Sequence, residues 1–371
     1  MLLQLAASVV LAYLIMKITV PYFSKVAEKI GFTDRGDSER KIHEENVPVI
    51  GGITMGFSIV IAIGMHINNS NIFSDTVIGL ILGAVVLLIA GVIDDKIDLR
   101  PLLKLAIQTC CAFLLVSNGI FLDEALSVLH LGGLPETAKI AISMAFIVGV
   151  VNAYNLIDGI DGLAGNLFSI SFACMGLTSI YLGMWDIGFL SVIVAVVCYA
   201  FVGFNTSERN KIFMGDGGSL MLGFLTAGVS IVMVERSFST GLSSEIIAGT
   251  AALLALPVFD EIRVFFTRIK AGKSPFAADR THIHHIFLQI NPQHSVVRRW
   301  IIGVAVAIFL GSVTIAAATH VLIAGAWIVL CITGLGTILK IQNEMFQHRD
   351  VLLRLEKKNR KPTDRSTIIT N

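Results

Sequence analysis

Long apolar runs repeat along this chain of 371 residues, and they constrain its fold more than any other feature. Each run approaches the roughly 20 residues that a helix needs to cross a bilayer. The expected spans cover residues 2–23, 49–67, 74–93, 101–120, 137–155, 163–182, 186–204, 217–236, 245–268, 298–318 and 320–340. Charged residues make up only 15% of the chain, against about 25% in a soluble domain. The sequence therefore predicts an all-α polytopic integral membrane protein with about 11 transmembrane helices.

Basic residues predict how this protein is oriented. Apart from Lys17, Lys139 and Arg236, every Lys and Arg falls in alternate loops or in the C-terminal tail. Because cytoplasmic loops carry an excess of Lys and Arg, we expect the N-terminus outside and the C-terminus in the cytoplasm. The first run lacks a basic leading segment and a small-residue cleavage site, which predicts a retained span in a cytoplasmic (inner) membrane protein.

Composition also excludes some classes of function. The formal net charge is +1, so the chain has no basic signature of nucleic-acid binding. The five cysteines lie inside apolar runs without metal-ligand spacing, and we interpret them as reduced core residues.

The most informative motif is Asn-Ala-Tyr-Asn-Leu-Ile-Asp-Gly-Ile-Asp-Gly, residues 152–162, which ends an apolar run. Asn152, Asn155 and Asp158 are spaced by three and form one polar stripe on a helix. Asp161 continues the spacing, although the glycines indicate that the helix ends there. A polar stripe in a membrane helix is costly unless it is solvated, paired or binds an ion. Helix capping by a solvated loop is the simpler alternative.

Other polar clusters fall on the same predicted cytoplasmic side. Asp94 and Asp95 end one run, with Arg100 and Lys104 after them, and suit a divalent metal or a base. Phe213–Ser219 reads Phe-Met-Gly-Asp-Gly-Gly-Ser, where glycines flanking Asp216 allow close approach to a ligand.

Two further clusters contain histidine. His282, His284 and His285 suggest zinc at first sight, but no Cys or HExxH partner accompanies them, and with Arg280 they fit a pyrophosphate better. Lys41 and His43 precede Pro48-Val-Ile-Gly-Gly52 and would by themselves form a basic loop and a turn. Carboxylates and amides for a metal, with basic residues for phosphates at a membrane face, indicate phosphoryl transfer between a nucleotide and a lipid.

In order, these motifs resemble the polyprenyl-phosphate N-acetylhexosamine-1-phosphate transferase family over residues 40–290, and His-Ile-His-His resembles its WecA and TagO branch. The resemblance implies that UDP-GlcNAc and undecaprenyl phosphate give undecaprenyl-pyrophosphoryl-GlcNAc and UMP. It further implies Mg²⁺ or Mn²⁺, frequently a homodimer, and the first membrane step of O-antigen, common-antigen or teichoic-acid synthesis. We accordingly expect a transmembrane catalytic domain (1–340) and a charged cytoplasmic tail (341–371).

The resemblance also implies roles for single residues. Asp94 and Asp95 look like the catalytic pair, with Lys104 near the phosphates, and Asp216 and Asn155 look like metal ligands. Uridine would be bound at Asp161, Asn205 and Phe213, and the diphosphate at Arg280, His282, His284 and His285. Further candidates are Lys41, His43, Asn152 and Asp158.

Two alternatives stay open at this point. The chain could transfer another UDP-N-acetylhexosamine, such as UDP-GalNAc or UDP-MurNAc-pentapeptide. The branch of the family that uses UDP-MurNAc-pentapeptide typically has a longer histidine run than this chain. Alternatively, Asp94, Asp158 and Asp216 could be cation sites of an ion-coupled transporter, whose carboxylates should lie near the middle of the membrane.

Overall fold

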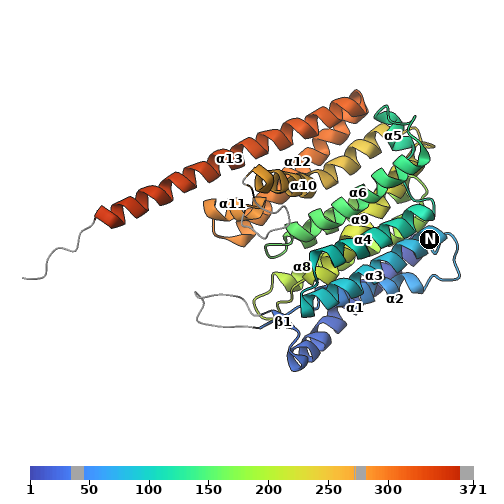
Figure 1. The fold of residues 1–371 in the computed structure, drawn as a ribbon. Coiled ribbons are helices and arrows are strands. Elements are labelled where there is room, and N and C mark those ends of the chain that lie inside the picture. The colour runs from blue at the N-terminus through green and yellow to red at the C-terminus, as the bar shows by residue number, and fades with distance from the viewer. Residues whose placement is uncertain (35–45, 271, 273–280, 360–371) are drawn as a thin grey trace, which may run out of the picture.

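The fold, seen in a computed structural model, is a bundle of long apolar helices that lie side by side (Figure 1). The structure describes residues 1–34, 46–270, 272 and 281–359. The longer helices are α1 (Leu2–Ile30), α2 (Gly51–Gly64), α3 (Asp75–Ile97), α4 (Pro101–Ser117), α6 (Glu136–Ile157), α7 (Leu163–Tyr181), α8 (Trp185–Asn205), α9 (Gly215–Ser237), α10 (Ser243–Lys270), α12 (His294–Ala318) and α13 (Val321–Asn359). Two short helices, α5 (Glu124–Val128) and α11 (Ile283–Ile290), and an antiparallel pair, β1 (Thr33–Asp34) with β2 (Val47–Pro48), lie between them.

Within the described residues, eight helices are long and apolar enough to cross a membrane: α1, α3, α6, α7, α8, α9, α12 and the part of α13 up to Phe346. Helices α2 and α4 are apolar but shorter. This confirms the predicted all-α polytopic membrane protein, and each predicted span corresponds to one of the longer helices. That all of them cross the bilayer remains a prediction.

Some boundaries differ from the predicted ones. Helix α2 stops at Gly64 instead of residue 67, and the chain then turns through His66 and Asn69. Helix α13 continues without a break past residue 340, where we expected the membrane domain to end, and its end projects from the bundle in Figure 1.

Helix α9 lies at the centre of the bundle. It packs against α2, α3, α6, α7 and α10, and the apolar part of the helix is buried throughout. Small residues allow this, because a Cβ on Gly91 of α3 would lie 2.4 Å from the Cα of Gly217. The first turn of α9, which contains Asp216, is therefore fixed by its neighbours.

Ion pairs and hydrogen bonds of charged side chains fix the opposite end of α9. Arg236 donates to both oxygens of Asp186 at 2.9 and 3.0 Å, and Glu235 accepts from the backbone N–H groups of residues 123, 124 and 125. Lys139 pairs with Asp123 at this end. The N-terminus lies at this end of the bundle, whereas β1 and α11 lie at the other (Figure 1).

Candidate functional site

The polar clusters of the sequence meet at one end of the bundle. Backbone hydrogen bonds of 2.9 Å join Gly51 to Phe213 and Gly52 to Met214, so the glycines that begin α2 support the turn that contains Asp216. His284 packs against Gly159, where a Cβ would lie 2.0 Å from its Nε2 atom. Segments far apart in the sequence thus lie together at this end of the bundle.

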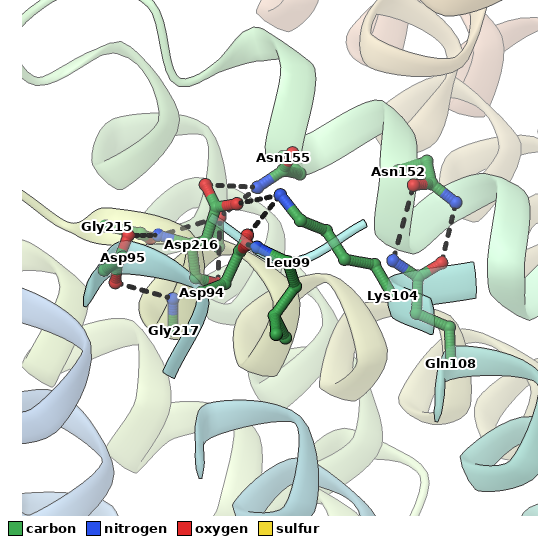
Figure 2. A network of polar contacts seen from close by, with 11 residues as sticks. Asp94, Asp95, Leu99, Lys104, Gln108, Asn152, Asn155, Gly215, Asp216 and Gly217 are labelled. Carbon is green, nitrogen blue, oxygen red and sulfur yellow. Dashed lines mark hydrogen bonds and ion pairs between the residues drawn. The ribbon is translucent and has the colours of Figure 1, made fainter. Parts of the chain in front are cut away.

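Asp94, Asp95, Lys104 and Asp216 form what we call the aspartate–lysine cluster (Figure 2). Lys104 of α4 pairs with Asp94 at the end of α3, and its Nζ atom lies 3.2 Å from Oδ2 of Asp216. Asp94 is buried, and its second oxygen accepts from the backbone N–H of Leu99 at 2.6 Å. One ammonium group therefore holds together two carboxylates that would otherwise repel each other.

Asp95 has a different set of partners. Its two oxygens accept hydrogen bonds from the backbone N–H groups of Asp216 (2.8 Å) and Gly217 (3.3 Å), as Figure 2 shows. These N–H groups belong to the first turn of α9, where they have no partner within the helix. Gly215, just before them, has a φ of 71°, which glycine adopts without strain. Asp95 thus acts as a cap that orients the Asp216 turn.

The two predicted amides of α6 have different partners. Asn155 donates to Oδ1 of Asp216 at 3.1 Å and to Oγ of Ser219 at 2.8 Å. Asn152 exchanges hydrogen bonds with Gln108 of α4. The structure therefore brings Asn155 to the cluster, whereas Asn152 is used to pack α6 against α4.

A cavity of about 660 Å³ opens beside the cluster. Asp95, Asn155 and Asp216 line one part of it. The three predicted uridine-binding residues also line it: Asp161, Asn205 and Phe213. Asn205 accepts from the backbone N–H of Gly162 and donates to the carbonyl of Ile212 at 2.8 Å, so it joins the Asp161 turn to the chain before Phe213.

Two carboxylates beyond the end of α6 line this cavity but differ in their protonation. Burial, together with the charges of Asp216, Asp161 and Asp95, raises the pKa of the half-buried Asp158 to about 7. Burial would also raise the pKa of Asp161, but hydrogen bonds from His294 and Lys211 outweigh it and lower the pKa. At neutral pH, Asp161 is therefore ionised while Asp158 is partly protonated.

The predicted diphosphate-binding histidines are mostly buried. His282 lies 3.0 Å from Oδ2 of Asp260, and its ring stacks with that of His284. Burial and the neighbouring His285 lower the pKa of His284 to about 3, so this imidazole is neutral near pH 7. Neither His282 nor His284 is among the described residues that line the cavity. Their contact with a diphosphate remains a prediction; in the structure His284 packs against Gly159 and His282 contacts Asp260.

Three candidates fall outside the described residues: Lys41, His43 and Arg280. Their predicted roles stay predictions.

Several residues of the site were not predicted. Lys211 lies 2.7 Å from Asp161, His294 lines the same cavity, and Ser219 accepts from Asn155. Asp260 holds the histidine segment through His282 and the backbone N–H of residue 283. A carboxylate within an apolar run, as at Asp260, was a signal in the sequence, whereas nothing distinguished Lys211 from the other basic loop residues.

The donor set fits the expected magnesium ion. Mg²⁺ prefers oxygen ligands and is often held by one or two carboxylates together with phosphate oxygens and water. Asp216 and Asn155 offer such oxygens at the cavity, although no group of three acidic, His or Cys side chains among the described residues is arranged to enclose a metal. An ion here would therefore need ligands from a bound diphosphate.

The sequence is similar to those of known proteins. The family model described as "Glycosyl transferase family 4" matches residues 77–234, which include much of the site. A "Probable undecaprenyl-phosphate N-acetylglucosaminyl 1-phosphate transferase" of Bacillus subtilis is 33% identical over 80% of this chain and 82% of its own length. An "Undecaprenyl-phosphate alpha-N-acetylglucosaminyl 1-phosphate transferase" of Escherichia coli is 26% identical over 78% of this chain and 77% of its own. A "Decaprenyl-phosphate N-acetylglucosaminephosphotransferase" of Mycobacterium leprae is 31% identical over 69% and 70%.

Proposed function

The chain belongs to the polyprenyl-phosphate N-acetylhexosamine-1-phosphate transferases of glycosyl transferase family 4, in the WecA and TagO group, and on this basis we propose the following reaction for it. It transfers GlcNAc-1-phosphate from UDP-GlcNAc to undecaprenyl phosphate, and the products are undecaprenyl-pyrophosphoryl-GlcNAc and UMP. This reaction would start a glycan of the O-antigen, common-antigen or teichoic-acid type.

The observation that carries the proposal is the aspartate–lysine cluster beside a polar cavity at the end of a membrane bundle. Asp216 lies in this cavity and contacts Lys104 at 3.2 Å. A cation next to carboxylates suits the positioning and neutralisation of phosphates, which is most of what phosphoryl transfer needs. Asp94 and Asp216 lie near the ends of α3 and α9, not at their middles, which is unlike the sites expected for a transporter.

The same cavity offers a place for the nucleotide. Phe213 would stack on the uracil, and the ionised Asp161 would accept a hydrogen bond from its imide N–H. Both residues line the cavity together with Asp216, so one UDP-sugar could contact the base-binding and phosphate-binding groups at once.

The contacts of the paired aspartates favour direct attack by the lipid phosphate over a covalent intermediate. Both oxygens of Asp95 accept hydrogen bonds from backbone N–H groups. One oxygen of Asp94 accepts a hydrogen bond from the backbone N–H of Leu99, and the other pairs with Lys104. A carboxylate in such contacts is a poor nucleophile towards a polyanion. A phosphate monoester with a second pKa of about 6 is largely a dianion at neutral pH and needs little help from a base. Lys104 would neutralise charge as UMP departs, and Asp94 would position Lys104.

Magnesium, with manganese as a substitute, is part of the proposal. Asp216 and Asn155 would hold it, and when bound it would neutralise charge on the diphosphate. We further propose that the site faces the cytoplasm, with the N-terminus on the opposite side of the inner membrane. The position of the N-terminus at the other end of the bundle supports its placement opposite the site, and the excess of Lys and Arg in the loops on the side of the site supports the cytoplasmic face.

A panel of sugar nucleotides tests the proposal. Purified protein with undecaprenyl phosphate and Mg²⁺ should release UMP fastest from UDP-GlcNAc and more slowly from UDP-GalNAc or UDP-MurNAc-pentapeptide. Asp216→Ala should lower the rate at least about 100-fold because it removes a group that acts on the diphosphate. Asp75→Ala, an exposed carboxylate in the first turn of α3, should leave it unchanged. Absence of UMP with every sugar nucleotide, together with substrate uptake into vesicles, would favour a transporter instead.

A further inference from the structure

Asp161 is held by two basic side chains from separate parts of the chain. Lys211, in the connection between α8 and α9, places its Nζ atom 2.7 Å from Oδ2 of Asp161. His294, the first residue of α12, places Nδ1 3.5 Å from the same oxygen. We call Lys211 and His294 the Asp161 clamp. Asp161 keeps 25% of its side-chain exposure, so it still faces the cavity while held.

The backbone around Asp161 is fixed as well. Arg298 donates to the carbonyl oxygen of Asp161 at 2.9 Å, and Asn205 accepts from the N–H of Gly162. Arg298 follows His294 by four residues, so one face of the first turn of α12 contacts both the side chain and the backbone of Asp161. With the backbone anchored in this way, the clamp determines where the carboxylate points.

Lys211 also connects Asp161 to the predicted stacking residue. Its ammonium group lies 5.2 Å from the centre of the Phe213 ring, within the range of a cation–π contact. The same side chain thus contacts the group that would accept a hydrogen bond from the base and the ring that would stack on it.

We infer that Lys211 and His294 are positioning residues for nucleotide recognition, which hold Asp161 as a hydrogen-bond acceptor beside Phe213 and thereby select uridine over cytidine. This inference rests on the proposed function, because it assumes that the cavity binds a UDP-sugar. It adds Lys211 and His294 to the proposed nucleotide site and gives a physical reason for selecting uracil over cytosine.

The selectivity follows from the chemistry of the two bases. Uracil has an N–H group at N3, which donates to a carboxylate, whereas N3 of cytosine is an acceptor. An ionised carboxylate only accepts hydrogen bonds, but a protonated one can also donate. By placing positive charge beside Asp161, the clamp keeps it an acceptor and leaves N3 of cytosine without a donor there. Loss of the clamp should therefore weaken uridine binding more than cytidine binding.

The test compares UMP and CMP as ligands of the purified full-length protein, by calorimetry and by inhibition of transfer. Lys211→Met should raise the Kd of UMP and the KM of UDP-GlcNAc about ten-fold, the usual effect of losing one charge-assisted hydrogen bond. The Kd of CMP should change much less, and kcat should stay within about two-fold. His294→Gln should raise the Kd of UMP about three-fold, because its contact is longer and more exposed.

Two controls separate positioning from a loss of folding. Lys211→Arg should restore most of the UMP affinity, because it keeps the charge beside Asp161. Arg209→Met removes a positive charge from the exposed part of the same loop and should leave both affinities unchanged.

The outcomes distinguish this inference from the proposed function. An unchanged ratio of CMP to UMP affinity in the Lys211→Met, His294→Gln double variant would overturn the clamp, as would tighter UMP binding in Lys211→Met. Wild-type protein that binds UMP but transfers no sugar phosphate would contradict the proposed reaction, while the affinity ratio would still decide the inference.

Discussion

At the scale of single residues, the carboxylates of the site differ by the groups that surround them. Asp95 binds backbone N–H groups, Asp94 and Asp216 share Lys104, and Asp161 is held by Lys211 and His294. For Asp158, no hydrogen bond or ion pair is observed among the described residues. Five chemically identical groups thus have different surroundings and different roles because of their neighbours.

The pH dependence of stability should reveal Asp158. Its pKa in the folded protein is about 7, raised by burial from the ordinary value of 3.8. A raised carboxyl pKa favours folding while the group is protonated, so this contribution is complete below pH 4 and is lost as the pH rises through 7. Asp158→Asn stays neutral throughout. The Tm of this variant relative to wild type should therefore rise by about 2–4 °C between pH 5 and pH 8.

An exposed carboxylate provides the control for this measurement. Asp98→Asn, at the exposed end of α3, should show no such change with pH. A Tm difference for Asp158→Asn that stays constant from pH 5 to pH 8 would mean that Asp158 is already ionised in the folded protein.

The motifs predicted most residues of the cluster, because short spacing in the sequence and the family resemblance both indicated them. Asp94, Asp95, Asn155 and Asp216 do meet in the structure. The partners of Asp161 could not be predicted in this way. Lys211 and His294 are 50 and 133 positions away from Asp161. The folding of the α8–α9 connection brings Lys211 to it, and the packing of α12 against the Asp161 turn brings His294.

At the scale of helices, close backbone contacts position the site. Gly52 of α2 meets Gly218 of α9 so closely that a Cβ on Gly52 would lie 2.3 Å from the backbone nitrogen of Gly218. Backbone atoms cannot move aside as the end of a flexible side chain can. The Asp216 turn is therefore sensitive to any added volume at this contact.

Gly52→Ala tests the importance of this contact. The added methyl group should shift the Asp216 turn, lower kcat at least about ten-fold and lower the Tm by several degrees, since overpacking costs about 1–3 kcal/mol. Gly64→Ala adds the same group at the other end of α2, where a Cβ would meet nothing within 4 Å, and should be harmless. Normal activity and Tm in Gly52→Ala would show that α2 does not position Asp216.

The apolar runs predicted the existence of the long helices well, because their length and composition leave few alternatives in a membrane. The ends were less predictable. Helix α13 continues to Asn359, past its apolar part, and this end projects from the bundle. The five-residue helix α5 carries no periodic pattern of its own, and Glu235 of α9 binds its first backbone N–H groups.

At the scale of the whole molecule, the two ends of the bundle use charge differently. At the end near the N-terminus, Lys139 and Arg236 pair with Asp123 and Asp186. At the other end, carboxylates and Lys104 gather beside a cavity large enough for a nucleotide. The first arrangement fixes loops, whereas the second provides groups for a reaction, in agreement with a site on one membrane face.

Isotope exchange tests the central claim, direct transfer from UDP-GlcNAc to the lipid phosphate, most directly. Purified protein is incubated with UDP-GlcNAc, labelled UMP and Mg²⁺, with or without undecaprenyl phosphate, and label in UDP-GlcNAc is measured. We predict label only when the lipid is present, because UMP can re-enter UDP-GlcNAc only by reversal of the complete transfer. Exchange in rigorously lipid-free protein, lost in Asp94→Asn or Asp95→Asn, would establish a covalent intermediate instead. Absence of exchange under both conditions would contradict the proposed reaction itself.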